Sequence, residues 1–159
     1  MRRSTLTVQF FTILSAFSVL LSAANAQILY RGTDSEDAAW ANGDPVTAQD
    51  FVFSYRRLMD PATNAKYATI LYPIKNAEKV NTGQLDPSEL GVRAIGDRTL
   101  EVTLEQPTPY FLDQLTHSTG KPLHQRSVEA LGDQFVKPGN MVTNGSYTLE
   151  SFTLSDRIV

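Results

Sequence analysis

Side chains that commonly carry out chemistry are scarce in this sequence. The chain has no cysteine, which excludes disulfides, thiolate nucleophiles and cysteine metal sites. Its two histidines, His117 and His124, are seven residues apart and have no third clustered ligand, so their spacing does not predict a metal centre. The G-x-S-x-G, H-E-x-x-H, P-loop and G-x-G-x-x-G patterns are also absent. We therefore expect neither an enzyme nor a protein that uses a cofactor.

Charged residues are spread along the chain rather than clustered. There are 17 acidic and 14 basic residues, which give a formal net charge of −3. Scattered carboxylates of this kind are ordinary solvated charges and do not form an acid–base pair. Phosphate binding needs clustered cations, and no block of lysine or arginine is present. Nucleic acid is therefore not an expected partner.

Residues 1–26 have the three parts of a cleavable secretory signal peptide. Arg2 and Arg3 supply the positive charge, residues 8–21 form the apolar run, and Ala24-Asn25-Ala26 fits the A-x-A cleavage pattern. The apolar run is shorter than the roughly 20 residues that span a bilayer, which disfavours a membrane anchor. We expect cleavage after Ala26.

Cleavage would leave a mature part of residues 27–159 with 12 basic and 17 acidic residues. This part has no second long apolar stretch, and no cysteine stands at its start to carry a lipid. The sequence thus predicts an exported, periplasmic protein with no lipid anchor and no membrane insertion after cleavage.

Local signals predict a mixed α/β (α+β) unit in the mature part, where about 130 residues give room for one core. Asn42-Gly43-Asp44-Pro45 is typical of a turn, because Asn and Gly tolerate positive φ and Pro fixes its own φ. Thr47 can then cap a helix in which Asp50 falls at the N3 position of a capping box. The helix is expected to stop before Pro61, since the residue preceding a proline is pushed out of the α region.

Other segments predict shorter elements. Residues 91–95 and 99–104 alternate on either side of a Gly-Asp pair, which indicates a hairpin. A short helix is expected over 127–131, and a strand over 147–154. Residues 67–74 are aromatic and β-branched, and their pattern is compatible with either a helix or a strand.

The stretch DAAWANGDPVTAQDFVFSYRRL, residues 37–58, resembles the signature of the extracellular solute-binding proteins, family 5. It is most similar to the oligopeptide-binding members of that family. The resemblance continues in several short runs and covers nearly all of residues 37–159. It implies a fragment of a periplasmic-binding-protein type II-like fold, with residues 27–159 forming a partial solute-binding domain.

The resemblance also implies a function. The family serves peptide and nickel ABC importers, and its oligopeptide-binding members capture peptides for import, so the implied partners are short peptides and the membrane permease subunits. Tyr67 falls where the family has a tyrosine facing the peptide, and His117 falls near another position facing the cleft. The alternatives are that Tyr67 packs in a core within its aromatic run and that His117 is an ordinary surface residue.

Two other functional hypotheses remain open. Family members are several times longer, and the family residues that hold both ends of the peptide lie far downstream of the positions present here. Residues 27–36 also run into the Trp40 segment without the usual intervening stretch, which suggests an internal deletion. One alternative is therefore a truncated remnant that binds nothing. The other is a small exported interaction module that pairs through an exposed sheet edge at residues 156–159.

Overall fold

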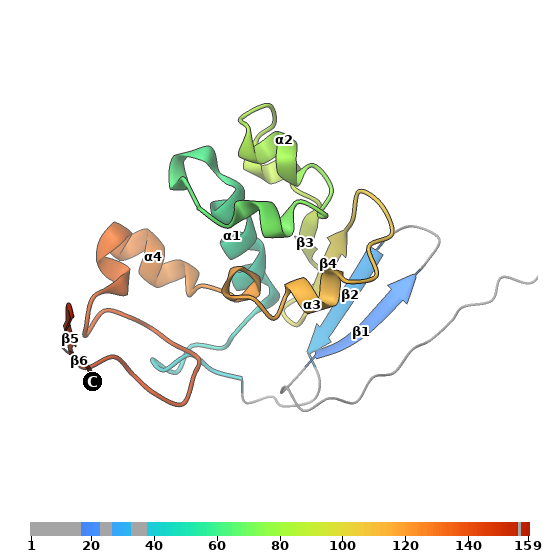
Figure 1. Cartoon of the computed structure of the whole chain (residues 1–159). Coiled ribbons are helices and arrows are strands. Elements are labelled where there is room, and N and C mark those ends of the chain that lie inside the picture. Colours follow the sequence, from blue (N-terminus) through green and yellow to red (C-terminus); the bar gives the residue numbers. More distant parts are fainter. Residues whose placement is uncertain (1–16, 23–26, 33–37, 156) are drawn as a thin grey trace, which may run out of the picture.

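The computed structural model describes residues 17–22, 27–32, 38–155 and 157–159. The predicted cleavage motif and the charged start of the predicted signal peptide lie outside these described residues. In the described part, a helix of three turns lies against a four-stranded sheet, and several short helices follow (Figure 1). This confirms the expected mixture of helices and strands.

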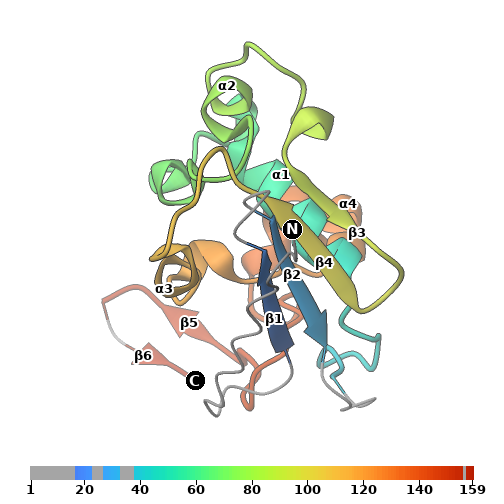
Figure 2. The same cartoon turned by 90° about the vertical axis from the view of Figure 1, so that its right-hand side faces the viewer.

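The sheet has the strand order β1-β2-β4-β3, and all neighbouring strands are antiparallel. The strands comprise β1 (Phe17–Ser22), β2 (Gln27–Gly32), β3 (Val92–Ala94) and β4 (Thr99–Thr103). In the turned view, β4 lies between β2 and β3, and β1 lies beside β2 on the edge opposite to β4 (Figure 2).

The β3–β4 hairpin agrees with the predicted one. Val92 pairs with Val102 and Ala94 pairs with Leu100. Gly96 has a φ of +71° in the connecting turn, a conformation that glycine adopts without the strain of a Cβ atom. The apolar residues of β4 alternate along the strand, so Leu100 and Val102 both face the core.

Helix α1 (Ala48–Met59) packs against strands β3 and β4 of the sheet. As predicted, it begins after Thr47 and ends at Asp60, directly before a proline. The Asp50 carboxylate accepts the backbone N–H of Thr47 at 2.9 Å, which is the return bond of the predicted capping box. The buried core is made by Ala48, Val52, Tyr55, Met59, Ala68, Leu71, Ile74, Ala77, Val80, Leu90, Val92, Leu100, Val102, Leu104 and Phe111.

Short helices connect and flank these elements. The segment whose type was open, residues 67–74, contains a 3-10 turn rather than a strand. The α-helices are α2 (Ala77–Asn81), α3 (Phe111–Gln114) and α4 (Gln125–Leu131). The 3-10 helices are η1 (Pro61–Thr63), η2 (Ala68–Leu71), η3 (Pro87–Glu89), η4 (Ser118–Gly120) and η5 (Gly132–Val136).

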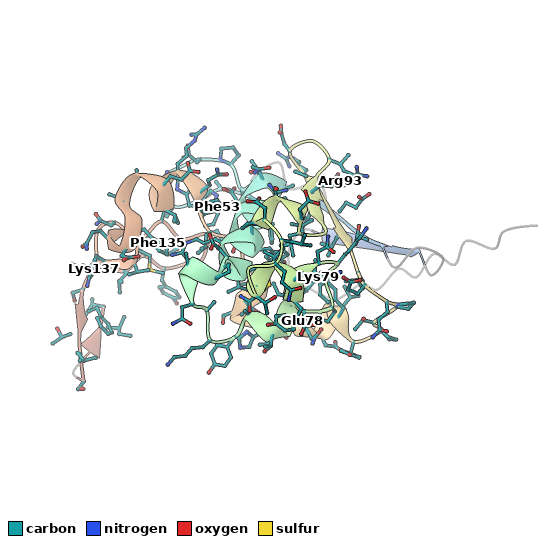
Figure 3. All side chains as sticks on the ribbon, turned by 90° about the horizontal axis from the view of Figure 1, so that it is seen from above. Phe53, Glu78, Lys79, Arg93, Phe135 and Lys137 are labelled. Carbon is teal, nitrogen blue, oxygen red and sulfur yellow. The ribbon has the colours of Figure 1, made fainter. Side chains whose placement is uncertain are left out.

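Side chains from several elements lie on both sides of helix α1. Seen from above, Phe135 and Lys137 lie on the α4 side of this helix, whereas Lys79 and Arg93 lie on its other side (Figure 3). On the α4 side, the guanidinium of Arg57 stands over the Phe135 ring, 5.7 Å from its centroid. This cation–π contact helps to hold the segment after α4 against α1.

The C-terminal segment ends in a small hairpin of β5 (Phe152–Thr153) and β6 (Arg157–Ile158). The predicted strand over 147–154 is therefore shortened to its last residues. Large apolar side chains are unusually exposed here, namely Tyr147, Phe152, Leu154, Ile158 and Val159. Among the described residues, no helix has both the length and the apolar character needed to cross a membrane.

Candidate functional site

The structure brings together the two residues that the resemblance singled out. Tyr67 immediately precedes η2, and His117 immediately precedes η4. Their ring centroids are 5.4 Å apart with an interplanar angle of 63°, an edge-to-face contact. These residues are 50 positions apart in the sequence, and their contact joins the two short helices.

Tyr67 is a surface residue. Its side chain is 60% exposed, whereas the following Ala68 and the nearby Leu71 are buried. The apolar side chains of η2 therefore anchor the turn, and the phenol stays accessible to a ligand. The structure thus disagrees with the alternative that Tyr67 packs in the core. Its role in peptide binding stays a prediction.

The His117 ring is oriented by its own turn. Its Nδ1 accepts the backbone N–H of Thr119 at 3.3 Å and lies 3.2 Å from the Thr119 hydroxyl. A neutral imidazole that accepts at Nδ1 carries its proton on Nε2. His117 thus supports the Tyr67 ring and holds an N–H that could be donated to a ligand.

The η4 turn is tied to α1 by two hydrogen bonds, one buried and one partly buried. The Tyr55 hydroxyl donates to the carbonyl of Gly120 at 3.1 Å, and the Ser54 hydroxyl donates to the carbonyl of Lys121 at 2.9 Å. Burial raises the pKa of the Tyr55 phenol, which therefore remains a donor at physiological pH. Any Cβ atom at Gly120 would lie 2.5 Å from the carbonyl oxygen of Leu115, so only glycine fits there. His117 is consequently held on a rigid support.

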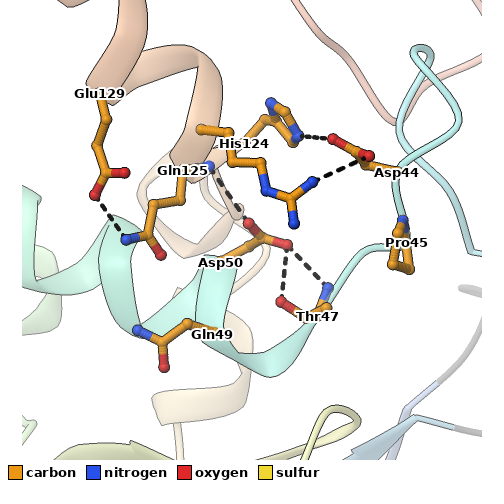
Figure 4. Close-up of a pocket in the computed structure, with 9 residues that line it drawn as sticks. Asp44, Pro45, Thr47, Gln49, Asp50, His124, Gln125 and Glu129 are labelled. Atoms are coloured by element: carbon orange, nitrogen blue, oxygen red, sulfur yellow. Dashed lines mark hydrogen bonds and ion pairs between the residues drawn. The ribbon is translucent and has the colours of Figure 1, made fainter.

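A second polar cluster lies where α4 meets the start of α1 (Figure 4). It surrounds an open pocket of about 360 Å³. The lining residues are Asp44, Pro45, Thr47, Gln49, Asp50, His124, Gln125, Arg126 and Glu129.

His124 lies at the centre of this cluster. Its Nε2 is 2.9 Å from Asp44 Oδ2, while its Nδ1 caps α4 by accepting the backbone N–H of Ser127 and also contacts the Ser127 hydroxyl. The hydrogen bond from His124 is the main cause that lowers the pKa of Asp44 below its ordinary value. Arg126 lies 3.4 Å from the same carboxylate and lowers that pKa further.

Asp50 connects the same cluster to the start of α1. Its carboxylate accepts the indole N–H of Trp40 at 3.2 Å and the backbone N–H of Gln125 at 3.4 Å, in addition to the capping bond. Trp40 also packs edge to face against the His124 ring, with centroids 5.3 Å apart. The buried polar atoms of this cluster are therefore partnered within the chain, as expected of a structural joint.

The Asp44, His124 and Ser127 side chains form a hydrogen-bonded row of the kind used in nucleophilic catalysis. Here, however, Nδ1 of His124 is already engaged as the cap of α4, and Ser127 does not line the pocket. We therefore assign the row to fold stability. Within the described residues, no group of three or more His, Cys, Asp or Glu side chains is arranged to hold a metal ion.

Sequence reasoning did not find the Asp44–His124 contact. The two residues are 80 positions apart, and neither stands in a motif that points to the other. The turn around Asp44 was predicted, but its connection to α4 depends on tertiary packing. No local signal could have identified it.

Comparison with known proteins defines the class. Residues 35–159 match the family described as "Bacterial extracellular solute-binding proteins, family 5 Middle". The match covers most of the chain, so the chain belongs to this family of solute-binding proteins. The resemblance seen in residues 37–159 is thereby confirmed.

Particular relatives share this unit. The chain is 44% identical over 126 residues to the periplasmic oligopeptide-binding protein OppA of Escherichia coli K12, which covers 78% of this chain and 23% of the relative. It is 36% identical over 138 residues to the periplasmic murein peptide-binding protein MppA of the same organism, covering 86% of this chain and 26% of MppA.

A solved structure agrees with these relationships. The crystal structure of Haemophilus influenzae OppA in complex with RPPGFSPFR superposes with a TM-score of 0.85 at 42% identity, covering 91% of this chain and 28% of that chain. The chain thus spans about a quarter of the length of the relatives it matches. These comparisons confirm the expected fragment of a periplasmic-binding-protein fold.

Proposed function

We propose that this chain serves peptide capture in the substrate-binding component of a periplasmic ABC importer. Its partners would be short peptides and the membrane permease subunits of that importer. The proposal is supported by membership of the solute-binding family and by relatives that are named as oligopeptide-binding and murein peptide-binding proteins. The observation that carries the proposal is the exposed Tyr67 ring held against His117.

The Tyr67–His117 surface has the chemistry that a peptide of unspecified sequence requires. A phenol presents an apolar ring face together with a hydroxyl that both donates and accepts hydrogen bonds. The N–H of His117 could bind a peptide carbonyl. Main-chain contacts of this kind give affinity without selecting particular side chains.

We also propose that residues 1–26 direct export and are then removed. The basic start, the apolar run and the A-x-A motif support this proposal. Amino-terminal sequencing of protein recovered from the periplasm should read from Gln27. A protein that retains its first residues in that compartment would contradict the proposal.

Calorimetric titration with a mixed pool of short synthetic peptides tests the peptide-binding proposal. Circular dichroism first establishes that the purified protein has a cooperative thermal transition. Saturable heat is the expected result. A folded protein that gives no heat would favour the alternative of a non-binding remnant.

A second function is favoured by the C-terminal hairpin. The side chains of Phe152, Leu154 and Ile158 are 53%, 80% and 70% exposed, which is unusual for residues of their size. An interaction module that pairs through this hairpin would bury them. Size-exclusion chromatography at high concentration tests self-association, and a clean monomer would argue against a partner of identical sequence.

A further inference from the structure

The strand β1 covers the whole outer edge of β2. The pairing runs through six residue pairs, from Phe17 opposite Gly32 to Ser22 opposite Gln27. On its other side, β2 pairs with β4. Consequently β2 is an inner strand of the sheet only while β1 is present (Figure 2).

The predicted signal peptide includes all of β1. If cleavage occurs before Gln27, the sheet order changes from β1-β2-β4-β3 to β2-β4-β3. The backbone N–H and C=O groups of β2 that face β1 would then lose their partners. An edge of unpaired groups is a template for another extended chain.

We propose that β1 covers this edge in the unprocessed chain, and that cleavage opens it to an extended apolar peptide that adds to the sheet antiparallel to β2. This inference rests on the proposed export signal and adds a peptide contact at the edge of β2. The strand β1 itself shows what the edge accepts. It is six residues long, and four of these, Phe17, Val19, Leu20 and Leu21, are apolar.

An apolar peptide suits the edge better than a second copy of the chain does. Pairing of two β2 edges would bring together two strands that each contain Arg31, and charged residues in edge strands disfavour such pairing. A neutral peptide like β1 introduces no like charge. Main-chain bonding would also tolerate different side chains, as peptide capture requires.

The first experiment measures binding of a fluorescent peptide with the sequence of residues 17–22 (FSVLLS), carrying neutral polar residues at its ends for solubility. It compares the processed protein with an unprocessed chain in which Ala24→Leu and Ala26→Leu block cleavage. If β1 covers the edge in nine of ten unprocessed molecules, the apparent affinity falls about tenfold. Fluorescence anisotropy should therefore show binding to the processed protein that is about tenfold tighter or more. Equal binding to both forms, or binding to neither, would overturn the proposal.

Two N-methylated peptides test whether binding uses the strand ladder. Successive N–H groups of a strand point to opposite sides. One peptide is methylated at its first, third and fifth residues, and the other at its second, fourth and sixth. The proposal predicts that only one of them binds, and any other result contradicts strand addition.

A full-length variant keeps the test valid if the processed protein does not fold. Val19→Pro with Leu20→Pro removes adjacent N–H groups, so β1 can no longer pair. This variant of the cleavage-blocked chain should bind the peptide about tenfold more tightly than the cleavage-blocked chain itself. Equal binding by the proline variant and the cleavage-blocked chain would contradict the inference. Neither of these chains is cleaved, so this result does not depend on the proposed export signal. Failure of the inference can therefore be distinguished from failure of the export signal, which amino-terminal sequencing tests. A processed protein that dimerises and excludes the peptide would also overturn it.

Discussion

The ring of Tyr67 lies edge to face against the ring of His117, with centroids 5.4 Å apart. The contact is made by residues at the starts of two short helices, and α1 holds the second helix through Tyr55 and Ser54. The exposed phenol is therefore placed by the core rather than by a free loop. Peptide affinity should therefore depend on His117, Tyr55 and Ser54, which hold the ring in place, as well as on Tyr67 itself.

Replacement of His117 should separate support of the ring from donation of a hydrogen bond. An aromatic pair contributes about 0.5 to 1.5 kcal/mol, so His117→Ala should weaken peptide binding by about twofold to thirteenfold. His117→Phe retains the edge-to-face contact but lacks the N–H, so it should recover only part of the affinity that His117→Ala loses. Calorimetric titration of both variants checks this. Equal losses in both would assign the effect to the N–H of His117 instead.

Gly120→Ala should destabilise the fold. The new Cβ atom would lie 2.5 Å from the Leu115 carbonyl oxygen and 2.9 Å from its Cα, so the backbone must move. Overpacking of this kind costs about 1 to 3 kcal/mol. Chemical denaturation measures the loss, and Gly145→Ala is the matched control because no atom lies within 4 Å of its added Cβ. Similar stability of the two variants would contradict the rigid support.

Asp50→Ala should destabilise the joint between α1 and α4. The substitution leaves the indole N–H of Trp40 and the capped N–H of Thr47 without their acceptor. Loss of a helix cap costs about 0.5 to 2 kcal/mol, and an unpaired buried donor adds to this. Asp60→Ala is a useful comparison, because Asp60 accepts only a local N–H, from Ala62, in an exposed turn. Urea denaturation should show the larger loss for Asp50→Ala.

Stability should fall in acid through Asp44. Its pKa is lowered in the folded protein, chiefly by the hydrogen bond from His124, so the ionised carboxylate favours folding. This contribution is fully present above the unfolded pKa of about 3.9 and is lost as the pH falls through the lower folded value. Asp44→Asn should therefore lose stability at pH 7 relative to the parent, and the difference should shrink near pH 3. A difference that is constant over this range would contradict the Asp44–His124 pairing.

The parts of the fold that could be predicted have local signals. The cap at Thr47, the stop before Pro61 and the alternation around Gly96 define α1 and the β3–β4 hairpin within a few residues each. The α4 helix begins two residues before the predicted 127–131 span, because His124 acts as its cap. The strand expected over 147–154 is confined to Phe152–Thr153, since alternation alone does not supply a pairing partner.

The candidate site was only partly predictable. The resemblance identified Tyr67 and His117 separately, and the structure shows that they are in contact and that Tyr67 is exposed. The network of Asp44, Asp50 and His124 was missed, because its members meet only after α4 packs beside α1. The spacing of Thr47 and Asp50 predicted the local cap, but no spacing in the sequence connects Asp44 or Asp50 to His124.

Titration of the peptide pool into Tyr67→Ala tests the central claim most directly. The matched control is Tyr147→Ala, since Tyr147 is an exposed tyrosine of the C-terminal segment. We predict that the parent and Tyr147→Ala bind alike, and that Tyr67→Ala binds about tenfold more weakly, a loss of about 1.4 kcal/mol. A folded Tyr67→Ala protein that binds peptides as tightly as the parent would contradict the account.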